Sequence, residues 1–237
     1  MSFLLSASLA AYEPQYKLLH LLEPVARGCP ASAGTAVPSS NVASHVEAKY
    51  CETRLPKQRA CVAYSFGVGG VWDFDKAMVE RGCRVRSFDP VCCGGAHPIG
   101  PNHDFAPLAL APYDGLLALT NYSTAGLTLK SVLAGYGDTK LDLLRLSVSS
   151  RSDWKGLRAL VDAPAQLKWV PQLLLNLHFS ESTRYDDYAE ILGGLKAAGF
   201  QPFYVARQPR AEYLQIQEGS RELWSRYEAA FGNTRLR

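Results

Sequence analysis

The chain has 237 residues, 47% of them hydrophobic and 20% charged. That composition excludes disordered and fibrous proteins and fits one globular domain with a sizeable core. The 25 basic and 22 acidic residues give a formal net charge of +3 and form no basic block, so a nucleic-acid partner is not expected. The longest apolar run near the start, residues 3–11, falls short of the roughly 20 residues of a membrane helix, so no transmembrane segment is expected.

The first segment, residues 1–56, is interpreted as an N-terminal extension and linker, and residues 57–237 as one domain. Apolar spacing predicts a helix over 16–26, and the Gly-, Pro-, Ser- and Ala-rich stretch at 28–41 is interpreted as a linker or loose loop. A degenerate signal peptide is the less favoured interpretation of the opening residues, because they lack the basic residues expected before its apolar stretch. The compartment of this soluble domain therefore stays open between the cytoplasm and the secretory pathway.

Six cysteines contain no C-x-x-C pair and match no familiar zinc spacing, so no metal site is expected. We predict that Cys61 and Cys83 are free thiols. Cys29 and Cys51 flank a loop and would pair if the chain is secreted, so their disulfide state is left open. The sequence Asn121-Tyr122-Ser123 would accept a glycan in that same compartment.

Short apolar runs alternate with helical patterns after residue 60, which is typical of βα units around a parallel sheet. Several runs are almost continuously apolar, as strands covered on both faces require. We therefore predict an α/β fold, a Rossmann-like three-layer α/β/α sandwich with a mostly parallel sheet of six to seven strands. The expected strands are 60–66, 83–88, 105–110, 141–148, 172–179, 200–206 and 213–216, and the expected helices are 73–81, 127–135, 153–161, 185–198 and 220–231.

A glycine-rich turn follows the first expected strand. Phe66 is followed by Gly67, Gly69 and Gly70, and glycine lets the backbone turn sharply and approach a ligand closely. The next strand ends at Asp89-Pro90, about 20 residues after the glycines, where a carboxylate accepts hydrogen bonds from ribose hydroxyls in nucleotide-binding folds. These six residues are the predicted cofactor-binding set.

The glycine pattern does not match a dinucleotide site. Position 72 holds Trp72, where the G-x-G-x-x-G pattern requires a third glycine for close helix packing over a pyrophosphate. S-adenosylmethionine has no pyrophosphate and tolerates a looser glycine loop. We therefore predict S-adenosyl-L-methionine as the cofactor, and rank a nucleotide-dependent oxidoreductase below it.

The run CVAYSFGVGGVWDFDKAMVERGCRVRSFDP, residues 61–90, resembles the methyltransferase-like protein 24 family, whose members carry Y-S-F-G, W-x-F-D, G-C-x-V and F-D-P in this order. The likeness continues more faintly to about residue 206 and excludes the first 45 or so residues. It implies a class I S-adenosylmethionine-dependent methyltransferase domain. It also implies that Gly67 and Gly69 lie at the methionine end of the cofactor and Asp89 at its ribose.

The chain departs from this family around the expected substrate position. Relatives carry acidic residues where this chain has Ser147, Ser149 and Asn176. His178, at the end of an expected strand, is the remaining candidate base, although a hydrogen-bonded structural histidine fits the pattern equally well. Ser147 and Ser149 are candidate substrate-binding residues.

Two functions follow. The first is methyl transfer to an unidentified acceptor, which is a small molecule, a sugar or a protein side chain. The second is a catalytically inactive methyltransferase-like binding module, because three carboxylates are missing. The Gly- and Pro-rich loop at 92–105 is interpreted as a mobile cover over the cofactor pocket.

Overall fold

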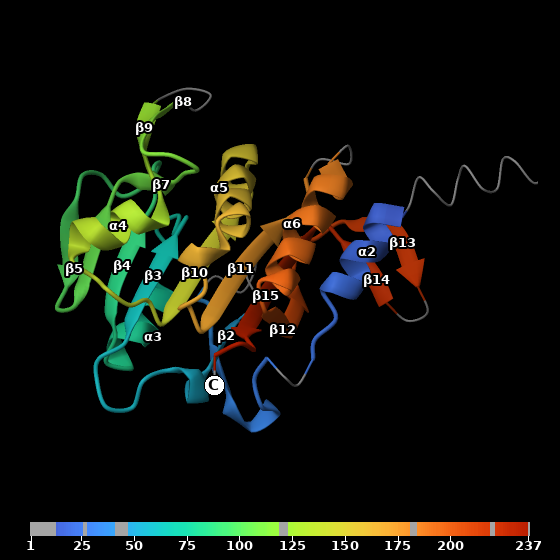
Figure 1. Ribbon diagram of the computed structural model, residues 1–237, viewed down its shortest axis with the longest axis horizontal. Coiled ribbons are helices and arrows are strands. Elements are labelled where there is room, and N and C mark those ends of the chain that lie inside the picture. The colour runs from blue at the N-terminus through green and yellow to red at the C-terminus, as the bar shows by residue number, and fades with distance from the viewer. Residues whose placement is uncertain are drawn as a thin grey trace, which may run out of the picture.

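A mixed eight-stranded sheet forms the centre of the computed structural model (Figure 1), which describes residues 13–25, 28–40, 47–118, 123–180, 184–218 and 221–236. In spatial order its strands are β12 (Phe200–Arg207), β15 (Arg226–Asn233), β11 (Gln172–His178), β10 (Leu143–Val148), β3 (Val62–Phe66), β4 (Arg84–Phe88), β6 (His103–Ala106) and β5 (His97–Gly100).

The sheet is parallel from β11 to β6, whereas β15 runs antiparallel to both of its neighbours and β5 runs antiparallel to β6. From β3 the chain proceeds to β4 and β6 on one side, and then returns to β10 and β11 on the other. The order therefore reverses between β3 and β10. Open α/β sheets bind ligands beyond the carboxyl ends of the strands at such a reversal.

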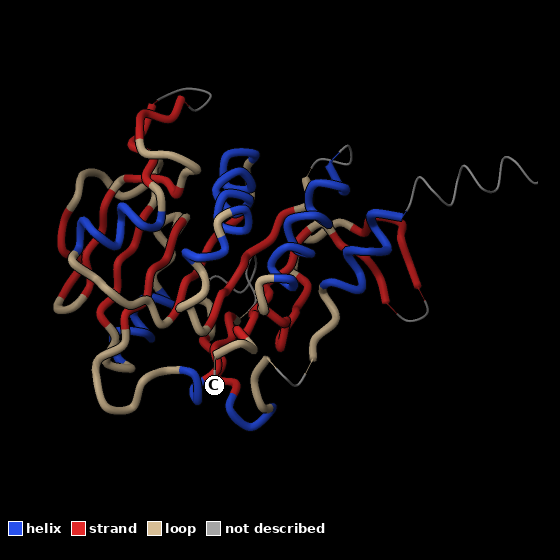
Figure 2. Tube along the Cα trace, in the orientation of Figure 1, coloured by secondary structure: helices blue, strands red, loops and turns tan. Residues whose placement is uncertain are grey.

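Helices and a hairpin cover the two faces of the sheet (Figure 2). Alternate strand residues point to opposite faces, so Leu144 and Leu146 of β10 join one core cluster and Leu143 joins the other. The first cluster includes residues of α2 (Glu13–Leu21), α4 (Leu129–Tyr136), α5 (Arg151–Asp162) and α6 (Tyr185–Ala197). The second includes α3 (Asp73–Glu80) and the hairpin of β1 (Gly34–Val37) with β2 (Ala48–Cys51). The predicted Rossmann-like fold class is confirmed, with one strand more than expected.

The predicted helix over 220–231 is wrong. Its residues form β14 (Arg221–Trp224), which pairs with β13 (Tyr213–Glu218), and most of β15. Glu and Ala favour helix locally, but β15 fills the slot between β11 and β12, where Ala229 and Ala230 are fully covered on opposite faces. Tertiary packing therefore overrides local propensity here.

The N-terminal segment packs on the sheet. Leu18 and Leu19 of α2 are buried, and the stretch interpreted as a linker contains β1, which pairs with β2. The predicted helix over 16–26 corresponds to α2, which begins earlier and ends at Leu21. The division between residues 56 and 57 stays a prediction.

Two other expectations near the sheet edge need correction. The loop at 92–105, predicted to be a mobile cover, contributes β5 and the start of β6 to the sheet. The single strand expected over 105–110 is split between β6 and β7 (Leu108–Leu110). With β8 (Gly115–Ala118) and β9 (Ser123–Leu127), β7 forms a separate three-stranded sheet. Three short 3-10 helices complete the described elements: η1 (Ala31–Ala33), η2 (Glu52–Arg54) and η3 (Pro164–Gln166).

The six cysteines form three disulfides, Cys29–Cys51, Cys61–Cys83 and Cys92–Cys93. The prediction that Cys61 and Cys83 are free is wrong, because these residues precede the neighbouring strands β3 and β4 and their Cα atoms lie 4.3 Å apart. The spacing of these cysteines in the sequence does not reveal that β3 and β4 start side by side.

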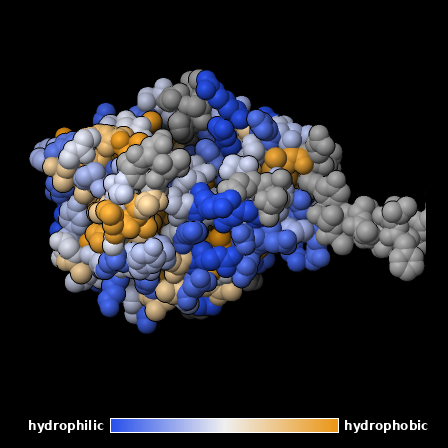
Figure 3. Space-filling model, turned by 90° about the horizontal axis from the view of Figure 1, so that it is seen from above, coloured by the Kyte–Doolittle hydropathy of each residue, from blue (hydrophilic) through white to orange (hydrophobic). Residues whose placement is uncertain are grey.

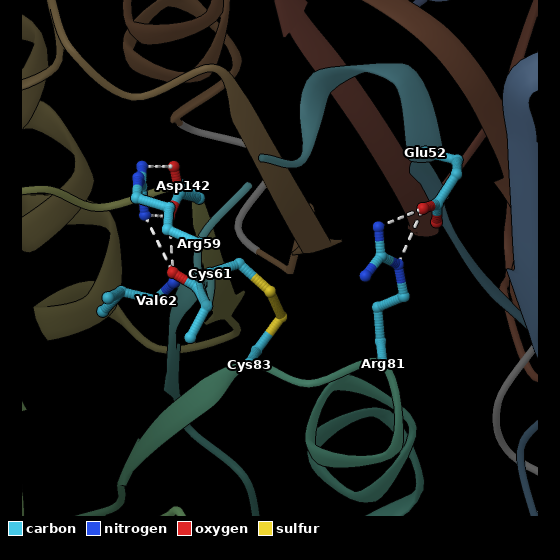
Figure 4. Close-up of a disulfide and its surroundings, with 8 residues drawn as sticks. Glu52, Arg59, Cys61, Val62, Arg81, Cys83 and Asp142 are labelled. Carbon is cyan, nitrogen blue, oxygen red and sulfur yellow. Dashed lines mark hydrogen bonds and ion pairs between the residues drawn. A yellow bond between two sulfur atoms is a disulfide. The ribbon is translucent and has the colours of Figure 1, made fainter. Parts of the chain in front are cut away.

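Ion pairs surround the Cys61–Cys83 disulfide (Figure 4). Arg59 donates to both carboxylate oxygens of Asp142, at 2.8 and 2.6 Å, and Asp142 also accepts the Val62 N–H at 2.9 Å. Arg81, the residue after α3, donates to Glu52 at 2.7 Å. The contacts of Asp142 fix the amino ends of β3 and β10, at the end of the sheet opposite the glycine turn.

Removing the Cys61–Cys83 disulfide should destabilise the fold far more than removing Cys92–Cys93. The first pair closes a loop with a sequence separation of 22, so a Cys61→Ala/Cys83→Ala chain should lose about 3 kcal/mol in the free energy of unfolding. The second pair joins adjacent residues and constrains little of the unfolded chain. Urea denaturation of Cys61→Ala/Cys83→Ala and of Cys92→Ala/Cys93→Ala measures the two losses in the free energy of unfolding. Equal losses would contradict this account.

Candidate functional site

The glycine turn after β3 adopts the backbone conformation that its sequence predicts. Gly67, Gly69 and Gly70 have φ angles of 76°, 56° and 75°, in the left-handed region that L side chains rarely adopt. A Cβ added to Gly67 would lie 2.8 Å from the Cβ of Ser147 on β10. At Gly67 the close approach of β10 therefore requires glycine, whereas a Cβ at Gly69 would meet nothing within 4 Å.

Asp89 joins this turn to the loop after β4. Its Oδ2 accepts the Gly69 N–H at 2.8 Å, and its Oδ1 accepts the N–H groups of Val91 and Cys92 at 2.8 and 3.0 Å. The residue is only 6% exposed, yet it borders an open cleft. A carboxylate has about four lone-pair sites, so Oδ2 retains acceptor capacity toward a ligand.

A cleft of about 1150 Å³ lies beyond the carboxyl ends of β3, β4 and β10. It is lined by four of the predicted cofactor residues and both predicted substrate residues: Gly67, Gly69, Asp89, Pro90, Ser147 and Ser149. Phe66 lines a smaller adjoining pocket together with Gly67, Pro90 and Ser147. Gly70 lines none of these pockets. The structure thus brings together most of the residues that the sequence predicts.

The residues on the opposite rim of the cleft were not predicted from the sequence. The loop before β8 and β8 itself contribute Tyr113, Leu116 and Leu117, and the Asp114-Gly115 turn was the available signal. Tyr113 and Leu116 are 60% and 74% exposed, and Val91 on the facing loop is 73% exposed. Figure 3, seen from the side that carries β8 and β9, shows apolar and hydrophilic surface next to each other. The cleft thus combines an apolar rim with the polar Asp89.

The first turn of α5 forms another wall of the cleft. Ser150 is the N-cap of α5 and forms a capping box with Asp153, whose Oδ2 also accepts from Ser149 N and Oγ. Both cap residues line the cleft. Ser149 is therefore partly occupied in fixing this helix end, whereas Ser147 lines the cleft and both pockets next to it.

His178, the predicted base, ends β11 and is not among the residues that line these three pockets. Its carbonyl oxygen accepts the Trp154 indole N–H at 3.1 Å. Its catalytic role stays a prediction.

A small cavity of about 50 Å³, separate from the cleft and from the pocket that Phe66 lines, lies between the sheet and the β1–β2 hairpin. Ser147 pairs with Asn176, and Asn176 pairs with Glu228, so three polar residues form a row across β10, β11 and β15. Arg145 lies two residues before Ser147 on β10 and also lines this cavity. The cavity shares Gly67 and Ser147 with the large cleft.

The charges around this cavity are buried and unevenly matched. Glu228 is 2% exposed; its Oε2 accepts a long, 3.4 Å hydrogen bond from Gln208, and its Oε1 has no hydrogen-bond partner among the described residues. Burial raises the pKa of Glu228 to about 7, while the Arg145 charge acts in the opposite direction. Burial also raises the pKa of Asp75, again against the effect of Arg145. One guanidinium therefore serves two buried carboxyl groups.

Glu228 was missed because its segment was expected to be helical. In a strand, its place between Tyr227 and Ala229 becomes an isolated charge within a buried run. A buried, unpaired carboxyl is costly unless something else satisfies it. That cost is the signal that would have singled out Glu228 once the strand was recognised.

Among the described residues, no cluster of three or more His, Cys, Asp or Glu side chains is arranged to hold a metal ion. None of the helices in the described parts of the chain has the length and apolar character needed to cross a membrane.

The chain is a Rossmann-like α/β/α domain with an open cleft at the carboxyl edge of its sheet. No protein-family model and no curated protein matches the sequence.

Several solved structures show weak likeness, among them the following three. The Burkholderia thailandensis 1,6-didemethyltoxoflavin-N1-methyltransferase with bound 1,6-didemethyltoxoflavin and S-adenosylhomocysteine is 16% identical, with a TM-score of 0.38, and the match covers 74% of this chain and 72% of that chain. Precorrin-6y C5,15-methyltransferase from Geobacter metallireducens is 10% identical, with a TM-score of 0.35 and coverage of 76% and 84%. A 16S rRNA adenine-1408 N1-methyltransferase from Catenulisporales acidiphilia is 13% identical, with a TM-score of 0.38 and coverage of 74% and 88%. At such low scores these likenesses carry no conclusion about function.

Replacing Glu228 by Gln should change how stability depends on pH. The folded-state pKa of about 7 lies above the ordinary value of 4.5, so the stability that protonated Glu228 contributes is complete below about pH 4.5 and is lost as the pH rises through about 7. Relative to the native chain, Glu228→Gln should therefore gain roughly 3 kcal/mol in the free energy of unfolding between about pH 4 and pH 8. Urea denaturation across this range measures the difference. Parallel pH profiles for the two proteins would show that Glu228 titrates normally.

Proposed function

We propose that the chain is an S-adenosylmethionine-dependent methyltransferase of the methyltransferase-like protein 24 group. The observation that carries the proposal is the large cleft, in which the glycine turn and Asp89 face each other at the reversal point of the sheet. The resemblance of residues 61–90 to that group supports it, because this run supplies both features.

The residues present fit the cofactor. Ligand pockets for molecules of this size are about 300–1,000 Å³, and the cleft of about 1150 Å³ leaves room for an acceptor group as well. Gly67 and Gly69 would hold the methionine end without side-chain interference, and the free acceptor capacity of Asp89 suits a ribose hydroxyl. The apolar rim at Tyr113 and Leu116 suits the flat face of the adenine base.

A dinucleotide suits the site less well. The ring of Trp72 packs against His103 and Phe105, with centroids 5.5 and 5.9 Å apart, at the position where a pyrophosphate-binding helix needs glycine. The sheet also departs from the parallel 3-2-1-4-5-6 order of dinucleotide-binding domains, because antiparallel β15 lies next to β11.

The bound sulfonium would supply a methyl group that is open to in-line displacement. The chain must then hold an acceptor in line with that methyl and take its proton if it carries one. A missing carboxylate at Ser147 or Ser149 does not prevent this, because positioning accounts for much of the barrier reduction in such reactions. The acceptor class is a small molecule, a sugar or a protein side chain.

The second candidate function is a binding module that has lost turnover. Ser149 favours it, since its hydroxyl is occupied by the α5 capping carboxylate in place of a free acid. Release of S-adenosylhomocysteine by the pure protein when cell extract is added, absent in a His178→Ala variant, would rule against this second function.

The three disulfides support a working compartment in the secretory pathway or outside the cell. Disulfides persist in oxidising compartments and are rare in the cytosol, and here all six cysteines are paired. The glycosylation sequence at Asn121 lies outside the described residues.

Calorimetric titration of the full chain with S-adenosylhomocysteine should give saturable binding, weakened about 10- to 100-fold by Asp89→Asn. The loss follows from removing a charged acceptor of ligand hydrogen bonds. Asp142→Asn is the matched control, because Asp142 is also a buried carboxylate that accepts a backbone N–H, from Val62 at 2.9 Å, but lies at the opposite end of the sheet and does not line the cleft. Absence of binding at millimolar ligand by well-folded protein would end the proposal.

Two alanine substitutions in the glycine turn should behave differently. Gly67→Ala brings its Cβ into contact with Ser147, so it should abolish cofactor binding and lower the melting temperature. The Cβ of Gly69→Ala meets no neighbouring protein atom, so the loss in the free energy of unfolding should be only the backbone strain, about 1 kcal/mol. Calorimetry and thermal unfolding of both variants check this, and equal behaviour would mean that the approach of β10 does not limit the turn.

A further inference from the structure

The small cavity beside the cleft has the layout of a site for one reactive group. Its volume of about 50 Å³ holds an amino or hydroxyl group and a carbon or two, far less than a cofactor. It meets the large cleft at Gly67 and Ser147, which line both. A group seated in the cavity thus lies next to whatever occupies the methionine end of the cleft.

The cavity presents two buried acceptors and one buried donor, Arg145 Nε, that have no hydrogen-bond partner among the described residues. Asn176 Oδ1 and Glu228 Oε1 have no hydrogen-bond partner among the described residues, and the two side chains are only 5% and 2% exposed. Their strands pair directly, with Asn176 opposite Glu228. Buried polar atoms are nearly always satisfied, so this pair indicates a ligand that donates hydrogen bonds.

The charge balance specifies the kind of donor. Arg145 is the one cation among the residues that line the cavity, against Glu228 and Asp73, with Asp75 buried close to Arg145. The remaining wall is largely apolar and includes Val37, Ala48, Val68, Val71 and Phe74. A cavity with surplus negative charge and apolar walls favours a cationic donor on a short carbon stem.

We propose that this cavity receives the amino group of the methyl acceptor and that Glu228 takes a proton from it. The proposal rests on the proposed function and names its substrate class as a primary or secondary amine. Asn176 Oδ1 would accept the second N–H and orient the nitrogen toward Gly67 and Ser147.

The transfer balances as follows. The ammonium group gives one proton to the Glu228 carboxylate and becomes a neutral amine with a free lone pair. The nitrogen lone pair forms a bond to the methyl carbon while the carbon–sulfur bond breaks, and the bonding pair stays on sulfur as a neutral thioether. The product leaves as the methylated ammonium, and Glu228 releases its proton to water.

Several groups set the protonation of Glu228. Arg145 on β10 favours its carboxylate, whereas burial between β11 and β12 opposes it. Tyr204 on β12, Asp73 and Asp75 on α3, and the amide of Gln208 complete its polar surroundings. A carboxyl that titrates near neutrality is suited to accept a proton at that pH.

Cofactor-free full chain titrated with methylamine and ethylamine hydrochlorides tests the cavity directly. Thermal unfolding at about pH 8.5 should show a saturable rise in melting temperature, and binding should be at least tenfold weaker at about pH 5.5, where Glu228 is protonated. Methanol and ethanol should give no saturable shift. Glu228→Gln should abolish the amine effect, whereas the exposed Glu222→Gln, the matched change on β14, should leave it intact.

Ala48→Leu provides a second variant that keeps every charge and fills the cavity from β2, and it should also abolish amine binding. S-adenosylhomocysteine should still bind Glu228→Gln with native affinity, since Glu228 does not line the cleft. Amine shifts that are absent in the native chain, or unchanged in Glu228→Gln, would overturn the amine site. If the native chain binds amines but does not bind S-adenosylhomocysteine, only the proposed function is overturned.

Discussion

The carboxylate of Asp89 is the link on which the arrangement of the cleft depends. It ties the glycine turn after β3 to the loop after β4 through three backbone N–H groups. Neither loop is a helix or a strand, so the backbone of each is held by hydrogen bonds such as these and the one from Gly67 N–H to the Phe88 carbonyl at 2.8 Å. A ligand that used the remaining acceptor capacity of Asp89 would therefore bind to a site that is already formed.

The opposite end of the sheet supplies the rigidity that this link needs. The Cys61–Cys83 disulfide and the Arg59–Asp142 pair hold the starts of β3, β4 and β10 together, so the three paired strands run from a fixed base to the glycine turn and Asp89. The disulfide also fits the proposed oxidising compartment, because disulfides persist there.

Short sequence patterns were sufficient to predict the parts of the fold that are formed by residues close together in the chain. The β3–α3–β4 unit, its glycine turn and Asp89 follow from apolar runs, glycine spacing and one carboxylate, and these lie within thirty or so residues. The C-terminal strand β15 did not follow, because its Glu and Ala residues favour helix until β11 and β12 enclose it. Because β15 was not predicted, Glu228 and the small cavity were not predicted either. The Cys61–Cys83 disulfide could not be predicted without knowing that β3 and β4 are neighbours.

A crystal structure of the chain with S-adenosylhomocysteine tests the central claim most directly. The account predicts the ligand in the large cleft, its ribose hydroxyls within hydrogen-bond distance of Asp89 Oδ2 and its sulfur next to Gly67 and Ser147, facing the cavity that holds Glu228. A ligand bound elsewhere, or in the cleft with its ribose away from Asp89, would contradict it.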